Sequence, residues 1–106
     1  MANQKYVAYV STYTMKNKNG ITIYDVDVEN GTMTEKGDVE ITNSSYLTCS
    51  HNNKYLYSIT DMGVKGYRIL EDGMLEEINY ASINGMRGCY LSTDYEDKFL
   101  FVAGYH

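Results

Sequence analysis

The sequence predicts an all-β protein made of antiparallel, four-stranded blades, that is, a truncated β-propeller. Three observations support this prediction. The 106 residues include 12 tyrosines but neither proline nor tryptophan, and the apolar fraction of 43% is enough for a packed core. Aromatic and β-branched residues favour strands, whereas no segment keeps the apolar spacing of an amphipathic helix. A strand-like segment also recurs along the chain, so a repeat of small sheets is expected.

The recurring segment starts with a lysine and continues with mainly apolar and aromatic residues. Its three copies are Lys5–Val10, Lys54–Ile59 and Lys98–Ala103, and their first residues are 49 and 44 positions apart. Other features recur at the same offsets, such as Ser45–Leu47 before the second copy and Cys89–Leu91 before the third. A period of about 40 to 50 residues that contains only strand-like segments is typical of propeller blades.

The second repeat predicts one complete blade. Its four strands are expected at Tyr46–Cys49, Tyr55–Ile59, Val64–Leu70 and Leu75–Ile83. Asp72–Gly73 separates the last two strands, and an Asp-Gly pair favours a tight hairpin because glycine adopts the positive φ that such turns require. The second of these strands carries apolar residues on both faces, which predicts that the blade is sandwiched between neighbours.

The repeats divide residues 1–106 into three parts of one partial propeller. Residues 5–43 are expected to form a first blade without its inner strand, residues 44–86 a complete blade, and residues 87–106 the start of a third. Closed propellers have about four to eight blades, and closure hides the strand edges. The sequence is therefore interpreted as a truncated piece of a longer protein, and its open blade faces are expected to cause self-association.

Charge and apolar patterning argue against several classes of partner. The net charge is −5, and the nine Lys and Arg residues do not cluster, so a nucleic-acid surface is not expected. No apolar stretch is long enough for a signal core or a membrane span, which predicts a cytoplasmic protein without a membrane partner. Cys49 and Cys89 are accordingly expected to be reduced.

No sequence pattern predicts a metal site or a cofactor. The segment Asp25–Gly31 superficially resembles a calcium-binding loop. Its glycine lies one place late, and Lys36 stands where such a loop has a bidentate glutamate, so this interpretation is rejected. No spacing of Cys and His residues is typical of zinc, and the sequence has no Gly-rich phosphate loop.

Four segments resemble, in order and spacing, motifs of the 6-phosphogluconolactonase-like lactonase family of β-propellers. They are Tyr-Val-Ser-Thr-Tyr-Thr at 9–14, Gly-Ile-Thr-Ile-Tyr-Asp-Val-Asp at 20–27, Ser-Ser-Tyr-Leu at 44–47 and Gly-Cys-Tyr-Leu-Ser-Thr-Asp at 88–94. The resemblance spans nearly all of this chain and the first third of a typical member. It implies a parent protein that hydrolyses a sugar-acid lactone of the 6-phosphogluconolactone type, without a cofactor, and a 106-residue piece that is inactive alone.

This chain departs from the family pattern at the third repeat. Tyr90 stands where the family has a histidine, and the proline that precedes the family's cysteine is absent before Cys89. Two other functions of the parent therefore stay open: a lactone-forming cycloisomerase on a related propeller, and a propeller that serves as a non-catalytic binding scaffold. The fold does not decide between them, because propellers host many functions.

Lactone opening needs a base that activates water and a cation or donor that stabilises the developing oxyanion. Asp61 and His106 are the candidate catalytic residues, since a carboxylate or an imidazole at the central channel can accept a proton. Arg87, Tyr90 and Tyr105 are the candidate substrate-binding residues. Arg87 lies in a glycine-flanked segment before an inner strand, and its guanidinium can bind a phosphate or carboxylate through two hydrogen bonds.

Each candidate also has a purely structural interpretation. Asp61 can be a turn residue that precedes Gly63, and Arg87 can lie in solvent or pair with a neighbouring acid. Tyr90 and Tyr105 can pack in a blade core, and His106 can belong to a frayed chain end. The sequence leaves these alternatives open.

Overall fold

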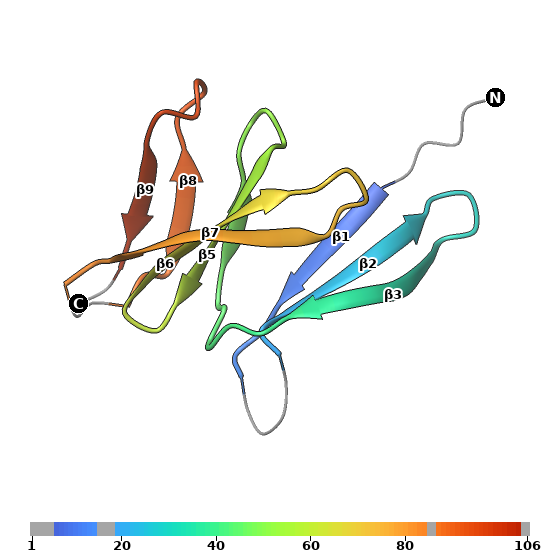
Figure 1. Ribbon diagram of the computed structural model, residues 1–106, viewed down its shortest axis with the longest axis horizontal. Helices are drawn as coiled ribbons and strands as arrows, with labels where there is room; N and C mark the ends of the chain where they lie inside the picture. Colours follow the sequence, from blue (N-terminus) through green and yellow to red (C-terminus); the bar gives the residue numbers. More distant parts are fainter. Residues whose placement is uncertain (1–5, 15–18, 85–86, 105–106) are drawn as a thin grey trace.

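The computed structural model describes residues 6–14, 19–84 and 87–104, and it confirms the all-β prediction (Figure 1). Three antiparallel sheets follow one another along the chain. The first contains β1 (Tyr6–Ser11), β2 (Ile21–Asp27) and β3 (Thr32–Val39); the second contains β4 (Leu47–Cys49), β5 (Tyr55–Thr60), β6 (Gly63–Ile69) and β7 (Leu75–Ser82); the third contains β8 (Tyr90–Thr93) and β9 (Leu100–Ala103). Within each sheet the strands lie in sequence order, so each strand pairs with its neighbour in the chain.

All four strands predicted for the second repeat are present, and each bound agrees with the prediction to within one residue. The predicted turn at Asp72–Gly73 joins β6 to β7. Gly73 has a φ of 89°, and its N–H donates to the carbonyl of Leu70 at 2.8 Å. A Cβ at position 73 would lie 2.6 Å from the side chain of Val7 in the first sheet. Glycine is therefore needed here both for the turn and for the approach of the neighbouring sheet.

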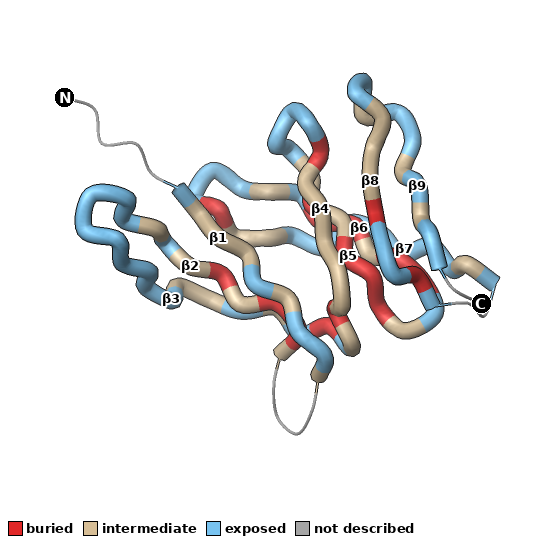
Figure 2. The backbone as a smooth tube through the Cα atoms, turned by 180° about the vertical axis from the view of Figure 1, so that it is seen from behind, coloured by how far each residue is buried: buried red, intermediate tan, exposed pale blue. Residues whose placement is uncertain are grey.

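The two middle strands of the second sheet, β5 and β6, are buried on both faces. One cluster of buried side chains lies between the first and second sheets and consists of Ile21, Ile41, Leu56 and Tyr67. The other cluster lies between the second and third sheets and consists of Ile59, Val64 and Leu91. In Figure 2 the buried segments, drawn in red, lie mainly where neighbouring sheets face one another. Since Leu56 and Ile59 lie on opposite faces of β5, the prediction of a sheet sandwiched between neighbours is confirmed.

Because successive strands run in opposite directions, alternate links gather at the same end of the stack. One end, the lower edge in Figure 1, holds the links β3–β4 and β5–β6 and the described parts of the links β1–β2 and β7–β8. We call this end the rim. The hairpin turns β2–β3, β4–β5, β6–β7 and β8–β9 lie at the opposite end. Across the described residues, no helix is long and apolar enough to cross a membrane.

Candidate functional site

The rim brings polar side chains from four links into contact. Thr14 follows β1, Thr42 and Asn43 lie between β3 and β4, Asp61 lies between β5 and β6, and Arg87 precedes β8. We call these five residues the rim cluster. They come from three successive sheets, so the cluster depends on how the sheets stack. Two of its members, Asp61 and Arg87, were predicted from the sequence as site residues.

The carboxylate of Asp61 is the centre of the rim cluster. One oxygen, Oδ2, accepts a hydrogen bond from Thr42 Oγ1 at 2.5 Å, and the other, Oδ1, accepts one from Asn43 Nδ2 at 2.8 Å. Arg87 Nη2 lies 3.6 Å from Oδ1. The bond from Thr42, then that from Asn43 and the charge of Arg87, hold the pKa of Asp61 below its usual value. Because a low pKa makes a carboxylate a weak proton acceptor, this environment favours a charged anchor over a general base.

Asn43 links the first and second sheets at the rim. Its Oδ1 accepts hydrogen bonds from the N–H and the hydroxyl of Thr14, both at 3.2 Å, while its own N–H donates to Thr14 Oγ1 at 3.1 Å. Asn43 has a φ of 52° and Asp61 has a φ of 25°. Residues other than glycine rarely adopt a positive φ, and among them Asn and Asp tolerate it best. Such backbone strain persists only where the surrounding contacts enforce it, and here a side-chain hydrogen bond joins the two residues.

Arg87 occupies in the third repeat the position that Asn43 occupies in the second, 44 residues earlier. Each of the two reaches back to the turn of the preceding sheet, Asn43 to Thr14 and Arg87 to Asp61. The side chains of Arg87 and Asp61 are 43% and 49% exposed. The structural alternative of a pair with a neighbouring acid is thus observed, but the guanidinium stays open to solvent and can also meet a ligand.

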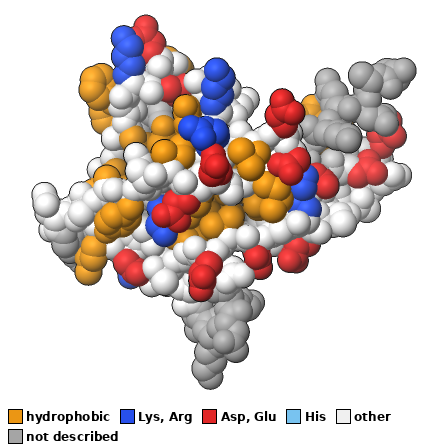
Figure 3. Space-filling model, in the orientation of Figure 1, with side chains coloured by type: hydrophobic (Ala, Val, Ile, Leu, Met, Phe, Trp, Pro, Cys, Tyr) orange, Lys and Arg blue, Asp and Glu red, His pale blue; other side chains and the backbone are white. Residues whose placement is uncertain are grey.

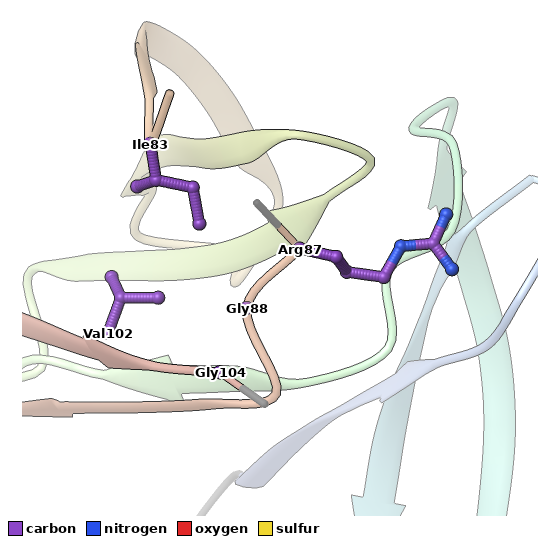
Figure 4. A pocket seen from close by; sticks show the side chains of 5 residues that line it. All are labelled: Ile83, Arg87, Gly88, Val102 and Gly104. Carbon is purple, nitrogen blue, oxygen red and sulfur yellow. The ribbon is translucent and has the colours of Figure 1, made fainter. Parts of the chain in front are cut away.

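A small pocket lies beside the backbone of Arg87. It has a volume of about 130 Å³ and is lined by Ile83, Arg87, Gly88, Val102 and Gly104. In Figure 4 the guanidinium of Arg87 extends away from Ile83 and Val102. Ligand pockets usually measure about 300–1,000 Å³, so this one is too small to enclose a sugar lactone. A ligand of Arg87 would therefore lie over the rim and not in this pocket.

Tyr90 is 50% exposed on the two-stranded third sheet, and its packing in a blade core stays a prediction for the complete ring. Its ring stacks on Tyr46 with a centroid distance of 5.0 Å and an interplanar angle of 41°. Tyr46 is the equivalent residue of the preceding repeat and packs against the cluster between the second and third sheets. Tyr105 and His106 lie outside the described residues, so their predicted roles, like substrate binding by Tyr90, stay predictions.

The opposite end of the stack carries a cluster that the sequence reasoning missed. Asp97 accepts hydrogen bonds from the backbone N–H groups of His51 at 2.8 Å and Asn52 at 3.0 Å. His51 Nδ1 lies 3.2 Å from Asp97 and 3.0 Å from Thr93 Oγ1. Both contacts use the same ring nitrogen, so the arrangement lacks the two-sided relay of a catalytic triad. Asp97 aligns with Asn53 of the preceding repeat. The replacement of asparagine by aspartate at this turn was the sequence feature that could have indicated the cluster.

Comparison with known families identifies the fold. The family described as lactonase, seven-bladed β-propeller, matches residues 7–106. The chain belongs to this lactonase family. The 6-phosphogluconolactonase of Bacillus subtilis strain 168 is 34% identical to it over 108 residues, which cover 96% of this chain and 31% of that protein. An uncharacterised protein of Staphylococcus saprophyticus is 36% identical over 104 residues, covering 92% of this chain and 29% of the relative.

Solved structures agree with this assignment. The crystal structure of a Bacteroides fragilis protein matches with a TM-score of 0.86 and 29% identity, over 95% of this lactonase-family chain and 30% of its own. The periplasmic gluconolactonase of Pseudomonas aeruginosa matches with a TM-score of 0.81 and 25% identity, over 93% and 31%. The predicted resemblance and the propeller fold are confirmed. The chain spans about 30% of the length of the relatives that it matches.

We expect Asp97→Asn to destabilise the lactonase-family chain near neutral pH and to matter less in acid. The backbone N–H of His51, followed by that of Asn52 and the ring of His51, lowers the pKa of Asp97 from 3.8 in the folded protein. The resulting stability is present above pH 3.8 and is lost as the pH falls through the lowered folded value. Urea unfolding of both chains at neutral pH and near pH 2 measures this difference. A difference that stays constant or grows on acidification would contradict the assignment.

Proposed function

We propose that these residues form part of a lactone hydrolase that acts on a sugar-acid lactone of the 6-phosphogluconolactone type. The observation that carries the proposal is the half-exposed guanidinium of Arg87, held at the rim by Asp61 in a lactonase-family propeller. The Bacillus subtilis relative is named a 6-phosphogluconolactonase, which supports this substrate class. The proposal concerns a complete ring, and the 106-residue chain alone is expected to be inactive. Cytoplasmic location remains part of the proposal.

In the proposed reaction, water attacks the lactone carbonyl and the ring C–O bond breaks. A base takes a proton from the water, and the ring oxygen gains a proton to become a hydroxyl, leaving an open-chain carboxylate. Arg87 would bind the anionic group of the substrate through its N–H donors and so position the lactone. Asp61 would hold Arg87, since its lowered pKa makes it a poor base. The base is expected to be another residue of the complete ring, and His106 stays the candidate that the sequence predicts.

We expect Arg87→Gln to reduce kcat/KM for lactone hydrolysis by about 10- to 100-fold, mainly through KM, because hydrogen bonds to a charged group are lost. The matched control is Arg68→Gln on β6, which removes an exposed arginine paired with Glu76 at 2.7 Å, away from the rim. Stopped assays of lactone opening in the full-ring protein give both constants. Equal effects of the two substitutions would rule out Arg87 as the anchor. Turnover only in the lactone-forming direction, or ligand binding without turnover, would favour a cycloisomerase or a binding scaffold instead.

We also propose that the 106-residue chain self-associates through its outer faces. Phe99, directly before β9, and Phe101 on β9 are 65% and 56% exposed, and Val10 on β1 of the first sheet is also exposed. Figure 3 shows hydrophobic side chains at the surface over the second and third sheets. The strands β1 and β9 are end strands of their sheets, so their outer backbone groups can pair with another copy.

Light scattering of the 106-residue chain tests this second proposal. A discrete oligomer is expected, and Phe101→Lys should shift it towards monomer because it places a charge on the covered face. Glu96→Lys, a control at an exposed ion-paired site in the β8–β9 turn, should leave the mass unchanged. A folded monomer at all accessible concentrations would refute self-association.

A further inference from the structure

We infer that Asp61 is a specificity-determining residue: its fixed negative charge holds Arg87 at the rim and weakens the binding of doubly charged oxyanions to this guanidinium more than that of singly charged ones. The inference rests on the proposed function, because it takes Arg87 as the anchor of an anionic substrate. It adds a substrate preference to that function, and it assigns the preference to a residue that does not itself bind the anion.

The geometry lets Asp61 hold Arg87 without occupying its donors. Their separation of 3.6 Å is within range of an ion pair but longer than a hydrogen bond. The short hydrogen bonds of Asp61 are made instead with Thr42 and Asn43, at 2.5 and 2.8 Å. The contact with Asp61 therefore consumes none of the N–H groups of Arg87, and a ligand can use them.

The charge of Asp61 is fixed in place and in sign. Two hydrogen bonds hold its carboxylate, and its backbone φ of 25° is maintained by the tight turn between β5 and β6. Donation from Thr42 keeps the pKa of the carboxyl below its usual value, so it is ionised at neutral pH. An oxyanion that binds Arg87 consequently always meets a negative charge beside the guanidinium.

The repulsion between Asp61 and a bound anion decides whether removal of the Asp61 charge tightens or weakens anion binding. For charges about 6 Å apart in a water-like dielectric, one added unit of charge weakens binding about threefold, and two units weaken it about tenfold. The orienting contribution of Asp61 is smaller, because an exposed ion pair contributes little stability. Removal of the charge should therefore tighten anion binding overall, and more for a dianion than for a monoanion.

The test is titration of the full-ring protein and its Asp61→Asn variant with gluconate, a monoanion, and with sulfate, a dianion. Asparagine tolerates the positive φ, its amide oxygen can still accept the hydrogen bond from Asn43, and its amide nitrogen can donate to Thr42 Oγ1, so the rim should keep its shape. The expected result is sulfate binding tightened about tenfold and gluconate binding tightened about threefold. A matched thermal unfolding curve checks that the variant is folded.

Asp97→Asn is the control, because it makes the same change in net charge at the opposite end of β8. At about 0.15 M salt the Debye length is about 8 Å, so this distant charge should leave both affinities unchanged. If Asp97→Asn changes them as Asp61→Asn does, the effect is global and the inference is wrong.

The remaining outcomes separate the inference from the proposed function. Equal tightening of both anions, or weakening of either, overturns the charge selection by Asp61 while lactone turnover still supports the function. The inference requires that Arg87 binds the anion. It is therefore overturned if anion binding survives Arg87→Gln, or if the wild-type protein binds neither anion. The expected selectivity in a protein without lactone turnover supports the inference and refutes the function.

Discussion

The burial of the second sheet between its two neighbours is the constraint on which the other features of this structure depend. A sheet covered on both faces needs apolar side chains at successive positions, and β5 supplies them with Leu56 on one face and Ile59 on the other. This stacking also fixes which links meet. The side chains of the rim cluster come from four links of three sheets, and only stacking brings them within hydrogen-bond or ion-pair distance of one another.

The repeat explains how the same position can have a structural role in one blade and a proposed ligand-binding role in the next. Asn43 and Arg87 are equivalent residues, and both reach back to the turn of the preceding sheet. Asn43 is short and makes close hydrogen bonds there, so it acts as a connection between sheets. Arg87 is longer, stays half exposed and carries a charge, so the same position presents a cation at the rim. A ligand site can arise in this way without a change of fold.

The strands and turns were predictable from the sequence because they depend on local patterns. The apolar residues on both faces of β5 and the Asp72–Gly73 turn are patterns of a few residues, and the family resemblance rests on the order and spacing of short motifs. The contact between Asp61 and Arg87 was not predictable, since it depends on the rotation of one sheet relative to the next. The exposure of Tyr90 depends in the same way on what covers the third sheet. The site predictions for Tyr105 and His106 concern residues outside the described structure.

Hydrogen exchange of the backbone amides tests most directly whether two-sided burial of the second sheet organises the protein. If it does, the amides of β5 and β6 exchange slowest and open only with global unfolding, while those of β1 and β9 exchange fastest among the strands. The account would be contradicted if β1 or β9 were as protected as β5, because stability would then not depend on cover from both neighbouring sheets.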